Sequence, residues 1–296
     1  MKKLKLQGAI TALVTPFNQD GSVDVESLKK LVQFQISGQI DGIVPCGTTG
    51  ETPILSEEEY KLVIETVVKE ANGRIPIIAG AGSNDTKKAI HYSQIAKEAG
   101  ADALLHVTPY YNKPTPAGLM AHFKAIAKAV DLPIVLYNVP GRTGSNVAAT
   151  TVIKISKEVP AVVGVKEASG NISQMMEIIQ GVSKDFSVLS GDDAFTLPLM
   201  AVGGVGIISV ASNQIPKEMA SLVRAALDGN FAKAKKLHYE WLDLMNINFI
   251  ESNPIPVKTA LALMGKIKEV FRLPLVSMEE KNREKLKEVL ISHKLI

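Results

Sequence analysis

Cysteine is nearly absent from this sequence of 296 residues, because Cys46 is the only one. A single cysteine excludes an intrachain disulfide and a cysteine-cluster metal site, and it fits a reducing compartment. An excess of one charge sign is also absent, since 33 Lys and Arg stand against 30 Asp and Glu and no basic run exceeds a pair. The net charge of +3 argues against nucleic acid as a main partner.

Long hydrophobic runs are missing as well. The apolar stretch near the N-terminus, residues 9–14, is interrupted by Thr11 and is too short for a secretory signal or a membrane span. We therefore expect a cytoplasmic protein with no membrane partner. The chain does contain 46% hydrophobic residues, which is enough for a sizeable core and excludes a disordered chain.

Short apolar runs recur along the chain, with helix-like segments between them. The runs cover residues 8–14, 42–46, 75–79, 101–107, 133–137, 161–166, 186–189 and 205–210. Most are rich in Val and Ile and do not alternate with polar residues, which is typical of parallel strands buried on both faces. They begin roughly 20–35 residues apart, which is the length that a strand–helix–strand unit needs.

Eight such units predict an α/β fold, a closed (β/α)8 TIM barrel, over residues 1–228. The alternative is an open doubly wound sheet. That fold normally carries a glycine-rich phosphate loop after its first strand, and residues 15–18 (TPFN) do not form one. Residues 229–296 predict a C-terminal helical extension, with helices over 231–248, 254–265 and 279–293.

Some helix details are also predicted by local patterns. Ser56 followed by Glu59 is a capping-box signature, and Asn84 is a candidate N-cap of the next helix. After the sixth apolar run, four residues follow the i, i+3, i+4, i+7 pattern of a core-facing stripe. They are Ile172, Met175, Met176 and Ile179. We interpret the two methionines as core residues rather than as ligands.

In a barrel of this kind the chemistry lies at the carboxyl ends of the strands. The sixth run ends in Lys166. A desolvated ammonium group has a lowered pKa, and the resulting amine can form a Schiff base with a carbonyl substrate. The alternatives are a lysine that reaches to the barrel rim or one paired with Glu167. Adjacent strand residues point to opposite faces, which makes that pairing geometrically poor.

The fifth run ends in Tyr137, and Arg142 follows in the next loop. A tyrosine beside the lysine strand can pass protons to and from a covalent intermediate. An arginine in that loop can grip a carboxylate with two parallel hydrogen bonds. Taken alone, a buried tyrosine with a backbone partner and a surface arginine remain simpler interpretations.

The second run leads into the segment 47–51 (GTTGE). Two hydroxyl groups and closely approaching backbone N–H groups make a small anion cradle, although a plain strand-to-helix turn remains the alternative. No lysine followed by Ser or Thr is present after the glycine, so this is not a nucleotide phosphate loop. Cys46 precedes the segment with no histidine nearby, and we interpret it as a small buried residue.

The remaining strand ends are less informative. Segment 108–114 carries two aromatic residues between prolines and suits packing or an oligomer contact. In segment 190–193, Asp192 is a candidate helix cap, and segment 203–209 indicates close backbone approach. The five histidines are scattered without metal-ligand spacing, so we expect no metal.

Taken together, these segments resemble the dihydrodipicolinate synthase family. The matching segments are 47–51, 108–111, 137–143, 164–170, 190–193 and 253–258. They occur in order over nearly the whole chain. The resemblance implies a (β/α)8 barrel with a helical tail and a class I aldol-type condensation. Pyruvate forms an imine with Lys166, becomes an enamine and attacks L-aspartate 4-semialdehyde. The product is 4-hydroxy-tetrahydrodipicolinate, on the path to diaminopimelate and lysine.

The resemblance also implies roles for individual residues. Tyr137, Thr48 and Tyr111 correspond to a proton-relay triad, and in the family the last tyrosine reaches in from a neighbouring subunit. A homotetramer built from tight dimers is therefore implied. The remaining positions correspond to substrate-binding groups. Thr48 and Thr49 hold the pyruvate carboxylate, Arg142 binds the semialdehyde carboxylate, and the backbone at Gly191 and Ile208 lines the pocket. No cofactor or metal is implied, because the lysine imine itself supplies the chemistry.

One part of the family pattern is not matched. Members inhibited by lysine carry a set of polar residues between subunits, and Asn84 and Tyr110 match that set. Glu57, Tyr60 and Lys88 stand where inhibited members often have His, His and Glu. A lysine side chain in place of a carboxylate repels a lysine ligand, so we expect weak inhibition by lysine or none.

Two other functions remain as alternatives. An N-acetylneuraminate lyase or a keto-deoxy sugar acid aldolase of the same superfamily shares Lys166 and Tyr137. Arg142 and the second threonine of GTTGE favour the smaller dicarboxylate-like product. A catalytically silent barrel that binds a keto acid is the other alternative, but such a protein is expected to lose the lysine, the tyrosine or a threonine.

Overall fold

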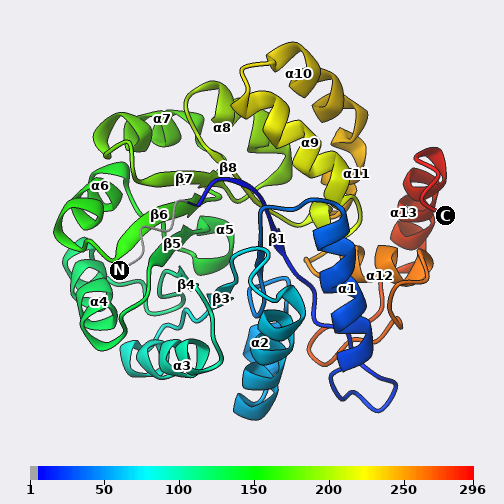
Figure 1. Cartoon of the computed structure of the whole chain (residues 1–296), viewed down its shortest axis with the longest axis horizontal. Coiled ribbons are helices and arrows are strands. Elements are labelled where there is room, and N and C mark those ends of the chain that lie inside the picture. The colour runs from blue at the N-terminus through cyan, green and yellow to red at the C-terminus, as the bar shows by residue number, and fades with distance from the viewer. Residues whose placement is uncertain (1–5) are drawn as a thin grey trace.

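The computed structural model describes residues 6–296, and its centre is a barrel of parallel strands (Figure 1). The strands are β1 (Gly8–Ala12), β2 (Gly42–Val44), β3 (Ile78–Gly80), β4 (Ala103–Val107), β5 (Ile134–Asn138), β6 (Val162–Glu167), β7 (Ser187–Ser190) and β8 (Gly206–Ser209). Neighbours pair in parallel in the order β2-β1-β8-β7-β6-β5-β4-β3. A parallel bridge between Ile43 and Ile77 joins the two ends of this order and closes the barrel. The eight predicted strands and the (β/α)8 barrel are thus confirmed.

The core has two layers, which explains why the strands lack alternation. One cluster fills the barrel and includes Ile10, Leu105, Val135 and Ile208. A larger cluster lies between the strands and the surrounding helices, and it includes Leu104. Successive residues of one strand therefore enter different apolar layers, and both faces must be hydrophobic.

Helices surround the barrel on its outside (Figure 1). They are α1 (Val25–Ser37), α2 (Glu57–Ala71), α3 (Thr86–Glu98), α4 (Pro116–Ala129), α6 (Ala149–Glu158), α7 (Ile172–Gly181), α8 (Thr196–Ala201) and α9 (Pro216–Leu227). The short helix α5 (Pro140–Thr143) directly follows β5 and lies inside this ring of helices in Figure 1. The 3-10 turns are η1 (Thr52–Ile54), η2 (Asp193–Phe195) and η3 (Ala211–Asn213). The capping box of Ser56 and Glu59 begins α2 as predicted. The predicted cap of α3 is wrong by one residue. Asp85 rather than Asn84 caps α3, because its carboxylate accepts from the backbone N–H of Lys87.

The buried face of α7 differs from the prediction. Met175 is fully buried, whereas the Met176 side chain is 44% exposed. Gln174 takes the other inward position because it donates to Glu167 and to the backbone oxygen of Val147. Because Gln174 has buried hydrogen-bond partners, α7 buries Gln174 in place of Met176. The pattern of apolar residues alone does not reveal this difference.

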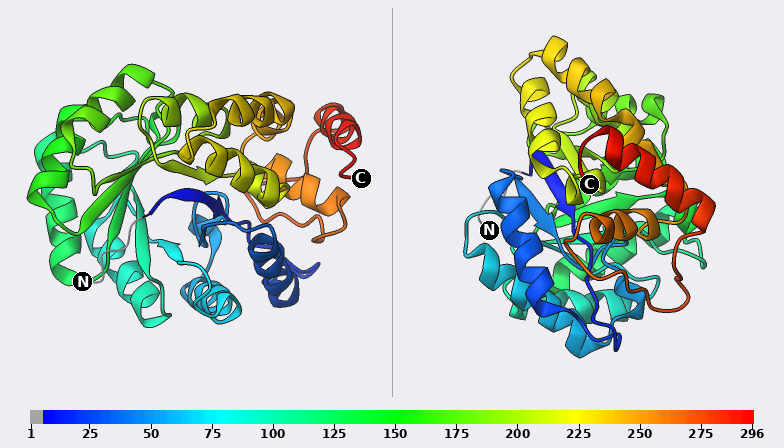
Figure 2. Two further views of the ribbon diagram at one scale, coloured as in Figure 1. Left: turned by 45° about the horizontal axis from the view of Figure 1, so that its top comes forward. Right: turned by 90° about the vertical axis from the view of Figure 1, so that its right-hand side faces the viewer.

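The C-terminal region consists of α10 (Phe231–Glu240), α11 (Leu242–Ile247), α12 (Ile255–Leu263) and α13 (Glu280–Ser292). The single helix predicted over 231–248 is divided at Trp241, which ends α10 and precedes α11. Figure 2 shows α12 and α13, in orange and red, at the side of the barrel where α1 and α9–α11 lie. The division of the chain at residue 228 stays a prediction.

Within residues 6–296, none of the helices combines the length and the apolar character needed to cross a lipid bilayer.

Candidate active site

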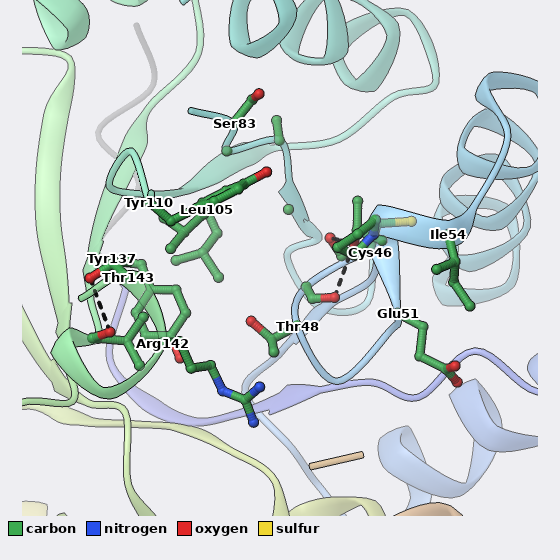
Figure 3. A pocket seen from close by; sticks show the side chains of 18 of the residues that line it. Cys46, Thr48, Glu51, Ile54, Ser83, Leu105, Tyr110, Tyr137, Arg142 and Thr143 are labelled. Carbon is green, nitrogen blue, oxygen red and sulfur yellow. Dashed lines mark hydrogen bonds between the residues drawn. The ribbon is translucent and has the colours of Figure 1, made fainter. Parts of the chain in front are cut away.

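A cavity of about 520 Å³ opens at the carboxyl ends of the strands, where the chemistry of such barrels is expected. Thr48, Tyr137, Arg142 and Asn253 are among the residues that line it. Figure 3 shows the side chains of Thr48, Tyr137 and Arg142 around this cavity, from three separate loops and strand ends. Three of the residues singled out by sequence are therefore brought together.

Lys166 lies directly next to this cavity, near the end of β6. Its side chain is only 5% exposed, and its Nζ is 4.3 Å from the centroid of the Tyr137 ring. Burial lowers the pKa of Lys166 to about 8, although the nearby Asp193 carboxylate opposes this shift and Arg142 adds to it. A lysine in this state holds a useful fraction of neutral, nucleophilic amine near neutral pH.

Glu167 does not pair with this lysine. Its carboxylate accepts from the Asn138 side chain at 3.0 Å, from Gln174 at 3.1 Å and from the Ser169 backbone N–H at 2.7 Å. Gln174 belongs to α7, so the Glu167 carboxylate faces the outer helices, because adjacent strand residues point to opposite faces. The structure thus excludes the Lys166–Glu167 ion pair that the sequence left as an alternative.

Tyr137, at the end of β5, is paired in register with Lys166 of the neighbouring strand. Burial raises the pKa of the Tyr137 hydroxyl to about 12, while Arg142 and hydrogen bonding with Thr48 partly offset that shift. The phenol therefore stays protonated at neutral pH and is able to donate a proton to a nearby base or oxyanion.

The turn 47–51 that carries the two threonines is held from several sides. Thr15 donates to the Gly50 carbonyl at 2.8 Å, and Asn253 donates from Nδ2 to Thr49 Oγ1 at 3.0 Å. Cys46, which precedes the turn, and Glu51, its last residue, both have left-handed backbone conformations, with φ of 54° and 56°. Such strained non-glycine residues persist only where the surroundings fix them, and they are concentrated at functional sites.

Arg142 follows β5 on the short helix α5, and its side chain is exposed to the cavity. Its Nη2 donates to the Asn253 carbonyl at 3.1 Å. In Figure 3 the guanidinium extends to the same part of the cavity as Thr48. A hydroxyl group and a fixed cation at one cavity suit a small carboxylate ligand.

Gly191 and Ile208 lie beside the lysine rather than among the residues that line the cavity. A side chain at Gly191 would place its Cβ 3.1 Å from Cε of Lys166 and 2.7 Å from Cβ of Ala168, so glycine leaves room for the lysine. Its N–H already donates to the Glu167 carbonyl at 2.8 Å. Ile208 belongs to the same inner cluster as Tyr137.

Thr49 is buried at 2% exposure and is not among the residues that line the cavity. Tyr111 is the predicted relay residue that this single chain does not bring to the cavity. Its side chain is 90% exposed and its backbone is left-handed, with φ of 68°. Tyr110, its neighbour, lines the cavity instead. A large aromatic side chain held outward in this way is available to another molecule.

Two charged groups of the site were missed by the sequence analysis. Asp193 is buried near Lys166 and accepts from Ser209 Oγ at 2.5 Å and from the N–H groups of Val210 and Ala211 at 3.0 Å. Burial raises its pKa to about 6. Lys258 forms a buried ion pair with Glu51. The acidic doublet after β7 was a signal for the first. Lys258 ends the segment 253–258 that resembles the family, but no local pattern indicated its ion pair with Glu51.

Neither Cys46 nor the buried His106 is suited to a catalytic role. Cys46 is fully buried, and burial raises the pKa of its thiol, so a reactive thiolate is disfavoured. Burial lowers the pKa of His106 to about 3, which keeps this residue neutral. Across residues 6–296, no three His, Cys, Asp or Glu side chains gather as a metal-binding group.

Comparisons with known proteins show what this chain is similar to. The model of the dihydrodipicolinate synthetase family matches residues 5–293. A protein of Koribacter versatilis, named 4-hydroxy-tetrahydrodipicolinate synthase, is 55% identical and covers 97% of this chain and 95% of its own. The crystal structure of dihydrodipicolinate synthase from Aquifex aeolicus has a TM-score of 0.96 at 49% identity, over 98% of this chain and 99% of that one. A structure described as the first monomeric dihydrodipicolinate synthase variant has a TM-score of 0.97 at 43% identity, over 99% and 98%.

Proposed function

The chain belongs to the dihydrodipicolinate synthetase family, and we propose on that basis that it condenses pyruvate with L-aspartate 4-semialdehyde. The product is 4-hydroxy-tetrahydrodipicolinate, on the path to diaminopimelate and lysine. The observation that carries this proposal is Lys166, a buried amine with a lowered pKa under the Tyr137 ring at the mouth of a barrel. Such an amine forms imines with keto acids.

The proposed reaction uses only side chains of this protein and its two substrates. The neutral Lys166 amine adds to the keto carbon of pyruvate, water leaves, and an imine forms. Loss of a proton from the methyl group gives an enamine, whose carbon attacks the aldehyde of the second substrate. The amino group of that substrate then displaces Lys166 from the imine carbon, which closes the ring and frees the lysine.

In this proposal the protons are transferred by Tyr137, Thr48 and Tyr111. The high pKa of Tyr137 suits a residue that donates and recovers a proton within each cycle. Tyr111 is exposed on the protomer, and its role requires a second copy of the chain. The proposed assembly is a homotetramer built from tight dimers, in the cytoplasm.

The substrate carboxylates are assigned to the remaining groups. Thr48 and Thr49 hold the carboxylate of pyruvate, supported by the fixed turn that carries them. Arg142 binds the carboxylate of the semialdehyde, for which its exposed guanidinium is suited. The backbone at Gly191 and Ile208 completes the pocket beside Lys166.

Borohydride trapping tests this function. The protein is incubated with pyruvate, reduced, digested and mapped by mass spectrometry, and a reduced pyruvyl adduct is expected on Lys166 alone. Aspartate semialdehyde and sugar aldehydes are then offered as second substrates, and turnover is expected with the semialdehyde. An adduct on another lysine, or none, contradicts the proposed mechanism. Turnover with a sugar aldehyde only would instead assign the chain to a related aldolase.

Weak inhibition by lysine is also proposed. Lys88, Asn84 and Tyr110 line the same cavity as the catalytic groups, so a lysine ligand there meets a like charge. Tyr60, which stands at one of the changed positions, is fully buried, with its hydroxyl donating to the Tyr92 carbonyl at 3.3 Å. It is therefore not free to bind a ligand.

Steady-state assays with added lysine measure this effect. At millimolar lysine the wild-type protein is expected to keep most of its activity. Lys88→Glu removes the repulsion and supplies a carboxylate, so inhibition is expected to strengthen in that variant. Strong inhibition of the wild-type protein by lysine at millimolar or lower concentration is the result that would disprove the proposal.

A further inference from the structure

A buried ion pair connects the C-terminal helical region to the barrel. Lys258 Nζ of α12 lies 2.5 Å from Glu51 Oε1, and the two side chains are 0% and 1% exposed. The same ammonium group lies 4.2 Å from the centroid of the Phe17 ring. Removing two charges from water costs much of what their attraction returns, so a pair of this kind is weak evidence for stability alone. Such a pair is better explained if it holds a group that binds substrate in its position.

The pair acts on the turn that carries the two threonines. Glu51 is the last residue of the turn 47–51, and its N–H donates to the Thr48 carbonyl at 3.1 Å. Its left-handed backbone is a conformation that a glutamate does not adopt without support. In Figure 3 the Glu51 side chain points away from Thr48. Glu51 is among the residues that line the cavity, but its carboxylate accepts from Lys258 and holds the turn on the side opposite Thr48.

The same part of the C-terminal region holds the other carboxylate-binding groups. Asn253 donates to Thr49 Oγ1 and accepts from Arg142 Nη2 through its backbone oxygen. Lys258 follows five residues later and holds Glu51. Each of these contacts joins residues more than 100 positions apart in the chain. The segment 253–258 therefore contacts the side chains of Thr49 and Arg142, which are assigned to the two substrate carboxylates. It holds the backbone of Thr48, the third assigned residue, through Glu51.

We propose that Lys258 is a positioning residue for pyruvate, which acts through Glu51 to fix the turn that holds the keto-acid carboxylate. This inference rests on the proposed function. It means that the C-terminal region contributes to the affinity for pyruvate, although it lies far from the turn 47–51 in the sequence. The competing explanation is that the pair only fastens α12 to the barrel.

Two variants separate these explanations. Lys258→Met keeps the aliphatic stem and breaks the link, but it leaves Glu51 buried without its charged partner. The double variant Glu51→Gln with Lys258→Met also breaks the link, yet it leaves no buried charge uncompensated, so its stability is expected to recover. Lys124→Met is the matched control, because Lys124 forms an ion pair of similar length, 2.6 Å, with Glu158 on the exposed surface.

The measurements are the pyruvate concentration that half-saturates borohydride inactivation, the pyruvate KM with kcat, and the thermal unfolding midpoint. Both link-breaking variants are expected to need about tenfold more pyruvate, the loss typical of one charge-assisted hydrogen bond, with the larger change in KM. The double variant is expected to unfold closer to the wild-type temperature than Lys258→Met does. The control is expected to match the wild-type protein in all three.

The result that overturns the inference is a folded double variant with the wild-type requirement for pyruvate. In that case the pair acts on stability alone. A double variant that recovers its stability but not its affinity for pyruvate supports the inference. A wild-type protein that forms no pyruvyl adduct would overturn the proposed function, and this inference with it, so the two failures are distinguishable.

Discussion

Lys166 shows how a single residue gains its chemistry from its surroundings. An exposed lysine is almost wholly protonated at neutral pH, and its ammonium group is no nucleophile. Burial under the Tyr137 ring lowers the pKa of Lys166 to about 8, and the Asp193 carboxylate limits the shift. The residue is thus neutral often enough to attack a carbonyl, yet it remains chargeable during the cycle.

The pH dependence of kcat/KM for pyruvate follows from this value. The neutral amine is the reactive form, so kcat/KM is expected to rise with pH, with a midpoint near 8, and to level off above it. Asp193→Asn removes the opposing negative charge, which lowers the lysine pKa further and moves the midpoint to lower pH. A profile that still climbs steeply beyond pH 10 would show that Lys166 keeps its ordinary pKa.

At the scale of an element, α7 shows how one buried polar residue redirects a helix face. Its inward positions are Gln174, Met175 and Ile178, whereas Met176 is exposed to solvent. The apolar pattern treated both methionines as equivalent. The hydrogen bonds of Gln174 to β6 and to the backbone before α6 decide between them.

Paired alanine substitutions measure that difference. Met175→Ala removes a fully buried side chain and leaves a cavity, so a loss of about 2–5 kcal/mol in the free energy of unfolding is expected. Met176→Ala is its control on the next residue and is expected to change that energy by less than about 0.5 kcal/mol. Denaturation of the two variants under the same conditions gives both values. Equal losses would mean that Met176 is a core residue after all.

At the scale of the whole molecule, the proposed proton relay is divided between the cavity and the surface of one protomer. Thr48 and Tyr137 line the cavity, while Tyr111 points outward with 90% of its side chain exposed. In a two-fold dimer each protomer contributes the same surface to the other, so an outward tyrosine is able to complete the partner's relay.

Mixed oligomers test this arrangement. Tyr111→Phe and Lys166→Ala are each expected to be nearly inactive alone. When the two variants are co-expressed, a mixed dimer pairs an intact lysine with an intact tyrosine at one of its two sites. Random pairing then restores about a quarter of the wild-type activity. Sedimentation measurements on the same samples give the oligomeric state. Restored activity in the absence of any dimer or tetramer would contradict the cross-subunit role.

Local patterns in the sequence are enough to place the strands and several reactive groups. Apolar runs record burial on both faces of a strand, and the carboxyl ends of parallel strands meet at one rim. Lys166, Tyr137 and the turn 47–51 were predicted in this way, and the structure places them at or next to one cavity. Arg142 was predicted because it follows a strand end directly, and it lines the same cavity. Each of these depends only on neighbours within a few residues.

The tertiary structure alone decided which groups shift the pKa of Lys166 and which hold the turn 47–51 in place. Asp193 lies beside Lys166 only because β6 and β7 are adjacent in the closed barrel. Lys258 meets Glu51 across 207 residues of chain. In a sequence, a lysine on a helix looks the same whether it faces water or a buried carboxylate. Only the packing of distant elements removes the water, and that removal gives these charges their effect.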